Sequence, residues 1–558
     1  MMKRYSKILS LLLAVVLLCS LAACAGNPTQ STAAPTTTGK STTTTAPQTT
    51  TTAAPALEGK VVISVQAGTG VAEAWEAVAK AYEAINQKVD VVVDLKPSEG
   101  YDTWIKNMFG TESPEADLVA INLAGPAAKD KAINFMEYAT DVSTYSGKPW
   151  NEQFNFEMQT KDLAQNEWTN ISLESVQVLW CYNKDLFAKA GAKVPTTWDE
   201  LIAACEKLQA AGIQPIACPG DFNSFWAMQM GWLAQIYADQ TTRSMLDVYK
   251  AHDGDYCYDP DIDGIFKLDI SDPFNDDSWK VNQNIVRAFK AISDGTYKAD
   301  SDGMKTVWAN FAKVFPKYAG GEAFFGTTDA LPLFYQGKAA MYIDGAWRLP
   351  SFKRDMDKLA AGEDVSGADT DGDGKPDPIE GVQKFELGTF NMPSMAGAGI
   401  EAKARTIEVA VGFLGAVKKE KAHDDLVVDF LMFYSSKDGY SAYMKAGLEN
   451  DWTPNGPPLV NDVELPAEYA AMFDNLSFIG NCQKGYGQMM ARGAPGDVQE
   501  SLREWYGYSQ EFLSGDITID QWAADHKANV AKYLDTAMTN SKVQKSDLDN
   551  PQNAPTGK

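Results

Sequence analysis

A twelve-residue segment, 369–380, carries oxygen-bearing groups at the spacing of a calcium-binding loop. Such a loop takes side-chain oxygens from positions 1, 3, 5, 9 and 12, a carbonyl from position 7, and a tight turn at a glycine in position 6. The corresponding ligands here are Asp369, Asp371, Asp373, the Lys375 carbonyl, Asp377 and Glu380. The pattern predicts one structural Ca²⁺ site that pins a segment at 351–388. The alternative is an acidic surface turn without metal.

Nothing else in the sequence indicates catalysis by a known motif. The three histidines, His252, His423 and His526, are isolated, and the cysteines form no CxxC pair. Cys205 falls on the apolar side of a predicted helix, where we expect a core residue. No nucleophile elbow, zinc helix, phosphate loop or dinucleotide fingerprint occurs.

The first residues have the composition of a secretory signal, with basic residues at 3, 4 and 7 and an apolar run over 8–18. The run ends in Leu21-Ala-Ala-Cys24, which resembles the bacterial lipobox. The resemblance implies a signal peptide at 1–23 and a diacylglyceryl group on Cys24. The alternative is a soluble secreted protein cleaved elsewhere.

Residues 24–57 are mostly Thr, Ala, Pro and Ser, which predicts a disordered linker that follows the anchor. The folded body is expected over 58–545, followed by a disordered tail at 546–558. The net charge of −25 disfavours nucleic acid and anionic lipid as partners, because like charges repel. Membrane contact is therefore expected through the lipid anchor only.

The body alternates strand and helix patterns, which favours an α/β fold with largely parallel sheets. Strands are predicted over 60–65, 89–95, 116–121, 176–182, 214–217, 339–343 and 406–417. Helices are predicted from Val71, from Trp198, over 422–434 and over 510–538, the last interrupted at Gly515. Thr197 and Glu200 have the spacing of a capping box at a helix start. Trp75 is expected in the core.

Several stretches, in a consistent order, resemble the extracellular solute-binding proteins of ABC importers, in particular the sugar and oligosaccharide class. These stretches are Tyr182-Asn-Lys-Asp-Leu-Phe-Ala-Lys-Ala-Gly191, Val194-Pro-Thr-Thr-Trp-Asp-Glu-Leu201, Leu208-Gln-Ala-Ala-Gly-Ile-Gln-Pro215, Phe334-Tyr-Gln-Gly-Lys-Ala-Ala-Met341, Gly345-Ala-Trp347, Phe390-Asn-Met-Pro393, 430–437 and Phe512-Leu-Ser-Gly-Asp-Ile-Thr-Ile-Asp520. The resemblance as a whole extends over about residues 60 to 540.

The resemblance implies a two-lobe, periplasmic-binding-protein-like (Venus flytrap) α/β fold with hinge crossovers and a helical C-terminal region. Lobe 1 is expected at about 58–176 plus 389–438, and lobe 2 at about 177–388 plus 439–540. It also implies a monomeric receptor, not an enzyme, on the extracellular face of the cell membrane. The receptor would bind a sugar or oligosaccharide between its lobes and deliver it to an ABC permease.

Sugar sites pair aromatic platforms with carboxylate or amide groups, and six residues are candidates for such a site. The resemblance places Trp347 in a Gly-x-Trp turn where a cleft-facing tryptophan is expected; a core role is the alternative. Asp344, just before that turn, could accept sugar hydroxyls or cap the turn. The others are Trp226, Glu99 and Asn122, in loops after predicted strands, and Trp452, in the loop 450–454.

Other functions remain open at this stage. A receptor for another small solute, such as a peptide or polyamine, shares the expected fold. A secreted glycoside hydrolase needs two carboxylates about 5 to 10 Å apart, and the chain has many acids. A cell-surface scaffold that uses the calcium loop is disfavoured, because only one loop occurs. The sequence does not decide between a single-membrane bacterium and a periplasmic lipoprotein.

Overall fold

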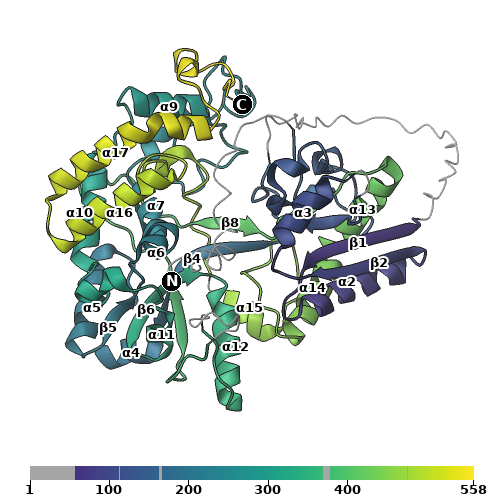
Figure 1. The fold of residues 1–558 in the computed structure, drawn as a ribbon, viewed down its shortest axis with the longest axis horizontal. Coiled ribbons are helices and arrows are strands. Elements are labelled where there is room, and N and C mark those ends of the chain that lie inside the picture. Colours follow the sequence, from purple (N-terminus) through teal and green to yellow (C-terminus); the bar gives the residue numbers. More distant parts are fainter. Residues whose placement is uncertain (1–56, 112–113, 162–165, 368–376, 474–475, 558) are drawn as a thin grey trace, which may run out of the picture.

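The computed structural model describes residues 57–111, 114–161, 166–367, 377–473 and 476–557, which form two lobes (Figure 1). The strands β4 (Glu174–Asn183) and β8 (Glu408–Val411) run between the lobes. Among the helices of these residues, none has the length and apolar composition that crossing a bilayer requires. The predicted signal peptide, Cys24 and most of the linker lie outside the described residues.

The first lobe is built on a four-stranded sheet. In spatial order its strands are β2 (Val89–Lys96), β1 (Gly59–Gln66), β3 (Leu118–Ala120) and β9 (Leu414–Ala416). The strand β1 is parallel to β2 and β3, and β9 is antiparallel to β3. The carboxyl ends of the three parallel strands therefore lie at one edge, where ligands bind in open α/β sheets.

Helices and short 3₁₀ turns cover this sheet. They are α2 (Val71–Ile85), α3 (Tyr101–Phe109), α13 (Lys421–Tyr434), α14 (Lys437–Glu449), η1 (Ile121–Leu123), η2 (Gly125–Ala128), η3 (Phe135–Glu137) and η4 (Trp150–Glu152), with α15 (Ala467–Phe473) beside the second lobe (Figure 1). The apolar spacing predicted from Val71 is confirmed, because Trp75, Val78 and Tyr82 of α2 are buried. The Trp75 ring contacts Tyr434, with centroids 4.6 Å apart.

The helix α14 belongs to the first lobe, so the expected placement of 439–540 in lobe 2 is wrong for this part. Tyr440, Tyr443 and Met444 are buried in the same apolar cluster as Trp75. The two helices approach closely because Gly447 has no side chain: a Cβ there would lie 3.3 Å from the Ala74 Cβ. The apolar face of α14 thus places the helix on the first lobe, and the small residue permits its close approach to α2.

The second lobe is built on a sheet around β4. The strands that join it are β5 (Gln214–Ala217), β6 (Ala339–Gly345), β7 (Leu387–Phe390) and β8, in the order β5-β6-β4-β7 with β8 on the first half of β4. Only β5 and β6 are parallel; β6, β7 and β8 run antiparallel to β4. The expectation of largely parallel sheets is wrong here, because β4 enters the second lobe while β7 and β8 return from it.

Helices surround this second sheet on the left side of Figure 1. They are α4 (Lys184–Ala190), α5 (Trp198–Ala210), α6 (Phe222–Ala227), α7 (Gln229–Asp239), α8 (Leu246–Tyr249), α9 (Ile285–Ser293), α10 (Asp302–Val314), α11 (Leu331–Tyr335), α12 (Arg348–Ala361), α16 (Gln499–Ser514) and α17 (Ile519–Asn540), with η5 (Arg243–Met245), η6 (Gly321–Gly326), η7 (Tyr486–Gln488) and η8 (Lys545–Asp549). The capping box is confirmed: Thr197 Oγ1 accepts from the Glu200 N–H, and the Glu200 carboxylate accepts from the Thr197 N–H. Cys205 is buried in the core, as predicted.

The predicted continuous strand over 406–417 is instead two strands, one in each sheet. Gly412 has φ +113° and Phe413 has φ +36°, conformations that a regular strand does not contain. The backbone therefore turns at these two residues, and β8 lies on β4 while β9 joins the first sheet. The break makes this segment a second crossing between the lobes. The expected placement of 389–438 in lobe 1 is therefore wrong for its first part, because β7 pairs with β4 and Met395 is buried in the second-lobe core.

The C-terminal residues 546–557 are ordered, so the predicted disordered tail is wrong over that range. Leu548 is buried against Val286 and Phe289 of α9. The Asp547 carboxylate accepts hydrogen bonds from the Thr556 N–H and hydroxyl group, at 3.0 and 2.6 Å. The Pro551 carbonyl accepts from the Asn284 side chain. One apolar anchor and several capping bonds thus hold a segment of polar composition.

Candidate ligand site between the lobes

The turn that ends β6 places Trp347 beside the hinge strands. The Trp347 indole folds back over Gly345, where a Cβ would lie 2.2 Å from the ring, so only glycine fits. The ring is half-buried, and its centroid lies 6.3 Å from that of Trp232 at an interplanar angle of 71°. It also packs with Val409 against the small cluster around Val176. Trp347 therefore lies on the face of the β4–β8 ladder that carries Val176.

Asp344 is buried and both its carboxylate oxygens accept hydrogen bonds within the turn. Its Oδ1 accepts from the Gly345 N–H at 2.9 Å, and its Oδ2 accepts from Arg348 Nε at 2.7 Å. These are the contacts of a turn-capping group, which is one of the two roles expected for it. The pairing fixes the start of α12 directly after Trp347.

A chain of hydrogen bonds runs from Arg348 to the first lobe. Arg348 Nη1 donates to the Tyr335 hydroxyl at 3.2 Å, and that hydroxyl donates to Asp355 Oδ2 at 2.7 Å. Arg354 donates to the other oxygen of Asp355, and its Nη1 donates to Thr453 Oγ1 at 2.8 Å. Thr453 follows Trp452 in a loop of the first lobe, so the chain connects the two tryptophan-bearing segments.

The loop 452–457 lies between the first lobe and the turn that carries Trp347. Trp452 is half-buried, and its ring meets Tyr443 edge-on with centroids 5.2 Å apart. Gly456 lies against both the hinge strand and the Trp347 turn: a Cβ there would lie 2.1 Å from the Ser175 carbonyl oxygen and 3.3 Å from the Ala346 Cβ. We call this contact between the lobes the seam. The segments that carry Trp452 and Trp347 are therefore in contact, although the two rings do not touch.

Glu174, the first residue of β4, was not among the predicted site residues. Its side chain is 6% exposed, and its Oε2 accepts from Asn455 Nδ2 at 2.6 Å. Burial raises the pKa of its carboxyl to about 7, against the lowering effect of the Asn455 hydrogen bonds. An acid at the start of a strand rich in apolar residues was the signal in the sequence that could have indicated it.

The remaining predicted residues are distributed over both lobes. Trp226 is buried in the second-lobe core on α6, and its indole N–H has no hydrogen-bond partner among the described residues. Glu99 is exposed after β2, and Asn122 is half-buried in η1 after β3. In the part of the chain that the structure describes, none of the six candidates forms a hydrogen bond or ring contact with another. Their roles as ligand contacts stay predictions.

Comparison with known proteins identifies the family. The model of bacterial extracellular solute-binding proteins matches residues 68–441. The chain belongs to this family. The predicted family is thereby confirmed, and it is a family of binding proteins rather than of enzymes.

Two curated relatives match this solute-binding protein over short stretches. A probable sugar-binding periplasmic protein of Rhizobium meliloti (strain 1021) is 34% identical over 95 residues, 17% of this chain and 22% of the relative. A protein of the same description from Brucella suis biovar 1 (strain 1330) is 46% identical over 50 residues, 9% of this chain and 12% of the relative. The chain thus matches less than a quarter of the length of either relative.

Two solved structures share the fold of this solute-binding protein over most of its length. The cyclic alpha-maltosyl-1,6-maltose binding protein from Arthrobacter globiformis is 15% identical, with a TM-score of 0.51, over 86% of this chain and 100% of its own. The apo form of RafE from Streptococcus pneumoniae is 16% identical, also at 0.51, over 85% and 98%. These likenesses confirm the predicted two-lobe α/β fold class.

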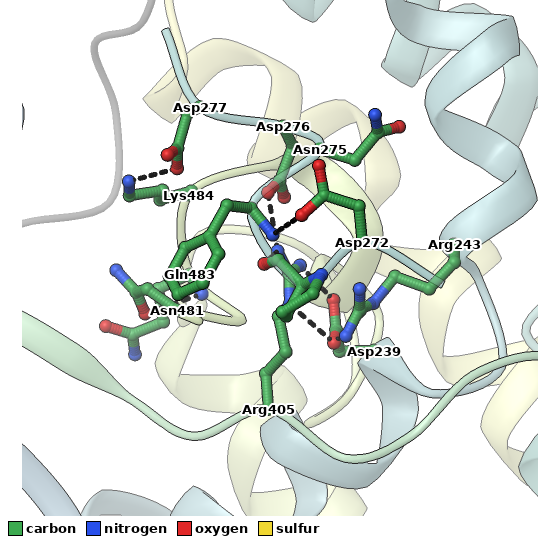
Figure 2. A network of polar contacts seen from close by, with 12 residues as sticks. Asp239, Arg243, Asp272, Asn275, Asp276, Asp277, Arg405, Asn481, Gln483 and Lys484 are labelled. Atoms are coloured by element: carbon green, nitrogen blue, oxygen red, sulfur yellow. Dashed lines mark hydrogen bonds and ion pairs between the residues drawn. The ribbon is translucent and has the colours of Figure 1, made fainter. Parts of the chain in front are cut away.

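A second polar cluster of this solute-binding protein is built around Arg405 in the second lobe (Figure 2). Arg405 is buried between Asp239 and Asp276, and Asp239 also accepts from Arg243 Nε at 2.8 Å. These residues line a cavity of about 10 Å³, which has room for about one water molecule and none for a sugar. The cluster is therefore a brace that fixes the segment 267–284 to the rest of the second lobe.

The predicted calcium loop lies largely outside the described residues, which include only Asp377 and Glu380 of its six ligands. The residues just before the loop pair with its later part: Ser366 and Pro378 form an antiparallel bridge, and the Gly367 N–H donates to the Asp377 carbonyl at 2.7 Å. Within the described residues, no group of three or more acids, histidines or cysteines is arranged to hold a metal. The calcium site stays a prediction.

Proposed function

We propose that this chain is a lipid-anchored extracellular receptor that binds a sugar or oligosaccharide between its lobes and delivers it to an ABC permease. The observation that carries the proposal is the seam between the lobes, where Trp452 and Trp347 lie on touching segments of opposite lobes. Aromatic faces suit the weakly apolar C–H faces of sugars, and the flanking arginine and asparagine groups suit hydroxyls. The two curated relatives, described as probable sugar-binding proteins, support the sugar class.

The hinge supplies the means of delivery. The lobes are joined by β4 and by the β8–β9 segment, so a ligand that contacts both lobes favours the closed arrangement. A permease can then distinguish loaded from empty receptor by shape. The anchor at Cys24 would keep a monomeric receptor close to that permease, and the ligand would be returned chemically unchanged.

A thermal-shift screen of the full-length protein tests the proposal, with maltotetraose, raffinose, N-acetylchitotetraose and a mixed tripeptide pool as ligands. A bound ligand at a hundredfold excess over Kd stabilises the fold by about 2.7 kcal/mol. We expect a rise in melting temperature with at least one sugar and none with peptides, and no change in that sugar on chromatography. A shift by peptides alone would support the other-solute receptor, and cleavage of the sugar would indicate a hydrolase.

A further inference from the structure

Three segments converge at Glu174. It is the first residue of β4 and pairs with Val411 of the other hinge strand. The carbonyl of the next residue, Ser175, abuts Gly456 of the first-lobe loop, and Gly456 in turn abuts Ala346, which directly precedes Trp347. A side chain at this position can therefore influence the relation between the hinge, the loop of the first lobe and the turn of the second.

The Glu174 carboxylate is buried without a cation. Its Oε1 has no hydrogen-bond partner, and no lysine, arginine or histidine pairs with it among the described residues. Burial raises the pKa of three tyrosine hydroxyls of α13 and α14, those of Tyr434, Tyr440 and Tyr443, and the Glu174 charge raises each of them further. A buried carboxylate of this kind lowers stability, so stability alone does not account for it.

What Glu174 holds is Asn455. The Asn455 amide donates to Oε2 at 2.6 Å and its backbone N–H donates to the same oxygen at 3.4 Å. Asn455 is otherwise exposed, and this bond ties its side chain to the hinge strand. The loop has further ties across the seam: the Pro457 carbonyl accepts from the Ser175 N–H at 3.0 Å and from the Ser175 hydroxyl at 3.5 Å, and Thr453 accepts from Arg354 of the second lobe.

We propose that Glu174 and Asn455 form a positioning pair that fixes the loop of Trp452 on the hinge, so that this tryptophan meets a sugar held against Trp347. The inference rests on the proposed sugar-binding function and deepens it. Glu174 is a positioning residue, because it acts on the ligand through the loop. Only one of its two carboxylate oxygens is hydrogen-bonded. The essential element is therefore the hydrogen bond to Asn455 and not the negative charge.

This distinction selects the variants. Glu174→Gln keeps an acceptor oxygen for Asn455 and removes the charge, whereas Glu174→Met has a similar size and no acceptor. We expect Glu174→Gln to bind the sugar with an affinity close to that of the wild type, and Glu174→Met to weaken binding about tenfold. Asn455→Ala should weaken it by a similar factor, and the double variant with Glu174→Met should be no weaker than either single one, because both remove the same interaction.

The experiment is isothermal titration of the full-length variants with maltotetraose, raffinose and N-acetylchitotetraose, together with urea unfolding of each variant. Both measurements are made at pH 8, above the pKa of about 7, where the Glu174 carboxyl is ionised. Glu174→Met then removes a buried charge, so it should be at least as stable as the wild type; weaker binding by a protein of undiminished stability excludes misfolding as the cause. Asp424→Asn is the matched control. Asp424 is a buried carboxylate of the first lobe that accepts a hydrogen bond from the Lys419 N–H and is not part of the loop. It should bind as the wild type does.

The outcomes separate the two claims. If the wild type binds a sugar and Glu174→Met binds it equally well, the positioning role is overturned and the proposed function stands. If Glu174→Gln loses as much affinity as Glu174→Met, the charge and not the hydrogen bond matters, and the proposal in this form is wrong. If the wild type binds none of the three sugars, the proposed function and this inference both fail.

Discussion

Replacing Arg405 by methionine tests the brace of the second lobe (Figure 2). Arg405 is 2% exposed, its Nε donates to Asp239 Oδ2 at 3.1 Å, and its Nη1 donates to the Pro273 carbonyl at 3.2 Å and to the carboxylate of Asp276. Methionine fills a similar volume and carries no charge. The variant therefore removes the cation and leaves the two carboxylates in place.

The expected loss follows from what remains unpaired. Asp239 keeps its ion pair with Arg243, whereas Asp276, which is 8% exposed, has no other ion pair among the described residues. Removing one partner of a buried ion pair costs about 3–5 kcal/mol, because the other charge stays buried. Asp276→Asn added to Arg405→Met should recover part of this loss, since the amide carries no charge.

Urea unfolding followed by tryptophan fluorescence measures the loss. Two controls bracket it: Arg243→Met leaves Asp239 paired with Arg405 and should cost less, and Lys88→Met breaks an exposed pair with Glu58 that contributes at most about 1 kcal/mol. A loss below about 1 kcal/mol for Arg405→Met, or no recovery in the double variant, would refute the assignment of this cluster as a brace.

Three further predictions concern charge, metal and lipid. Burial raises the pKa of Glu408 to about 7, against the lowering effect of Lys484. The folded state therefore keeps this proton to a higher pH than the unfolded state, and the contribution of Glu408 to the free energy of unfolding falls as pH rises from about 4.5 to about 7. Glu408→Gln should gain about 3 kcal/mol over the wild type between pH 5 and pH 8, measured by urea unfolding at each pH. Chelation with EDTA should lower the melting temperature, and Ca²⁺ should restore it. Cys24→Ser should move the protein from the detergent phase to the aqueous phase in phase partitioning.

Each of these has a result that would contradict it. A constant stability difference between Glu408→Gln and the wild type across this pH range would show that the carboxyl titrates normally. For the calcium loop, the matched variant is Asp373→Asn, which should melt at the temperature of the chelated wild type; no effect of chelation on the wild type would dismiss the site. Detergent-phase recovery of Cys24→Ser would mean that another feature attaches the protein to the membrane.

Local interactions were predictable from the sequence. The capping box of Thr197 and Glu200 lies within one helical turn, and the apolar positions of α2 follow from the spacing of Trp75, Val78 and Tyr82. In each case the residues that interact, or that share one face of a helix, are only a few positions apart in the chain. The strands β1 and β2 were found for the same reason, as short runs rich in valine.

Long-range pairings were not predictable in this way. Glu174 and Asn455 are 281 positions apart, and Arg405 lies 166 positions from Asp239. Nothing in the neighbourhood of either residue indicates its partner, because the topology of the hinge brings them together. The lobe of α14 was missed for the same reason: it depends on the packing of Tyr440, Tyr443 and Met444 in the cluster that holds Trp75, far away in the chain. The tail was missed because a single residue, Leu548, supplies its apolar anchor.

The most direct test of the account is the sugar affinity of Trp347→Ala beside the wild type, by isothermal titration with the sugar that gives the largest thermal shift. Truncating an aromatic platform at the centre of a site costs about 2 kcal/mol or more, so the affinity should fall more than tenfold. Trp279→Ala is the control, since this tryptophan is 60% exposed and, among the described residues, is not part of the seam. Equal affinities for Trp347→Ala and the wild type would contradict a sugar site at the lobe interface.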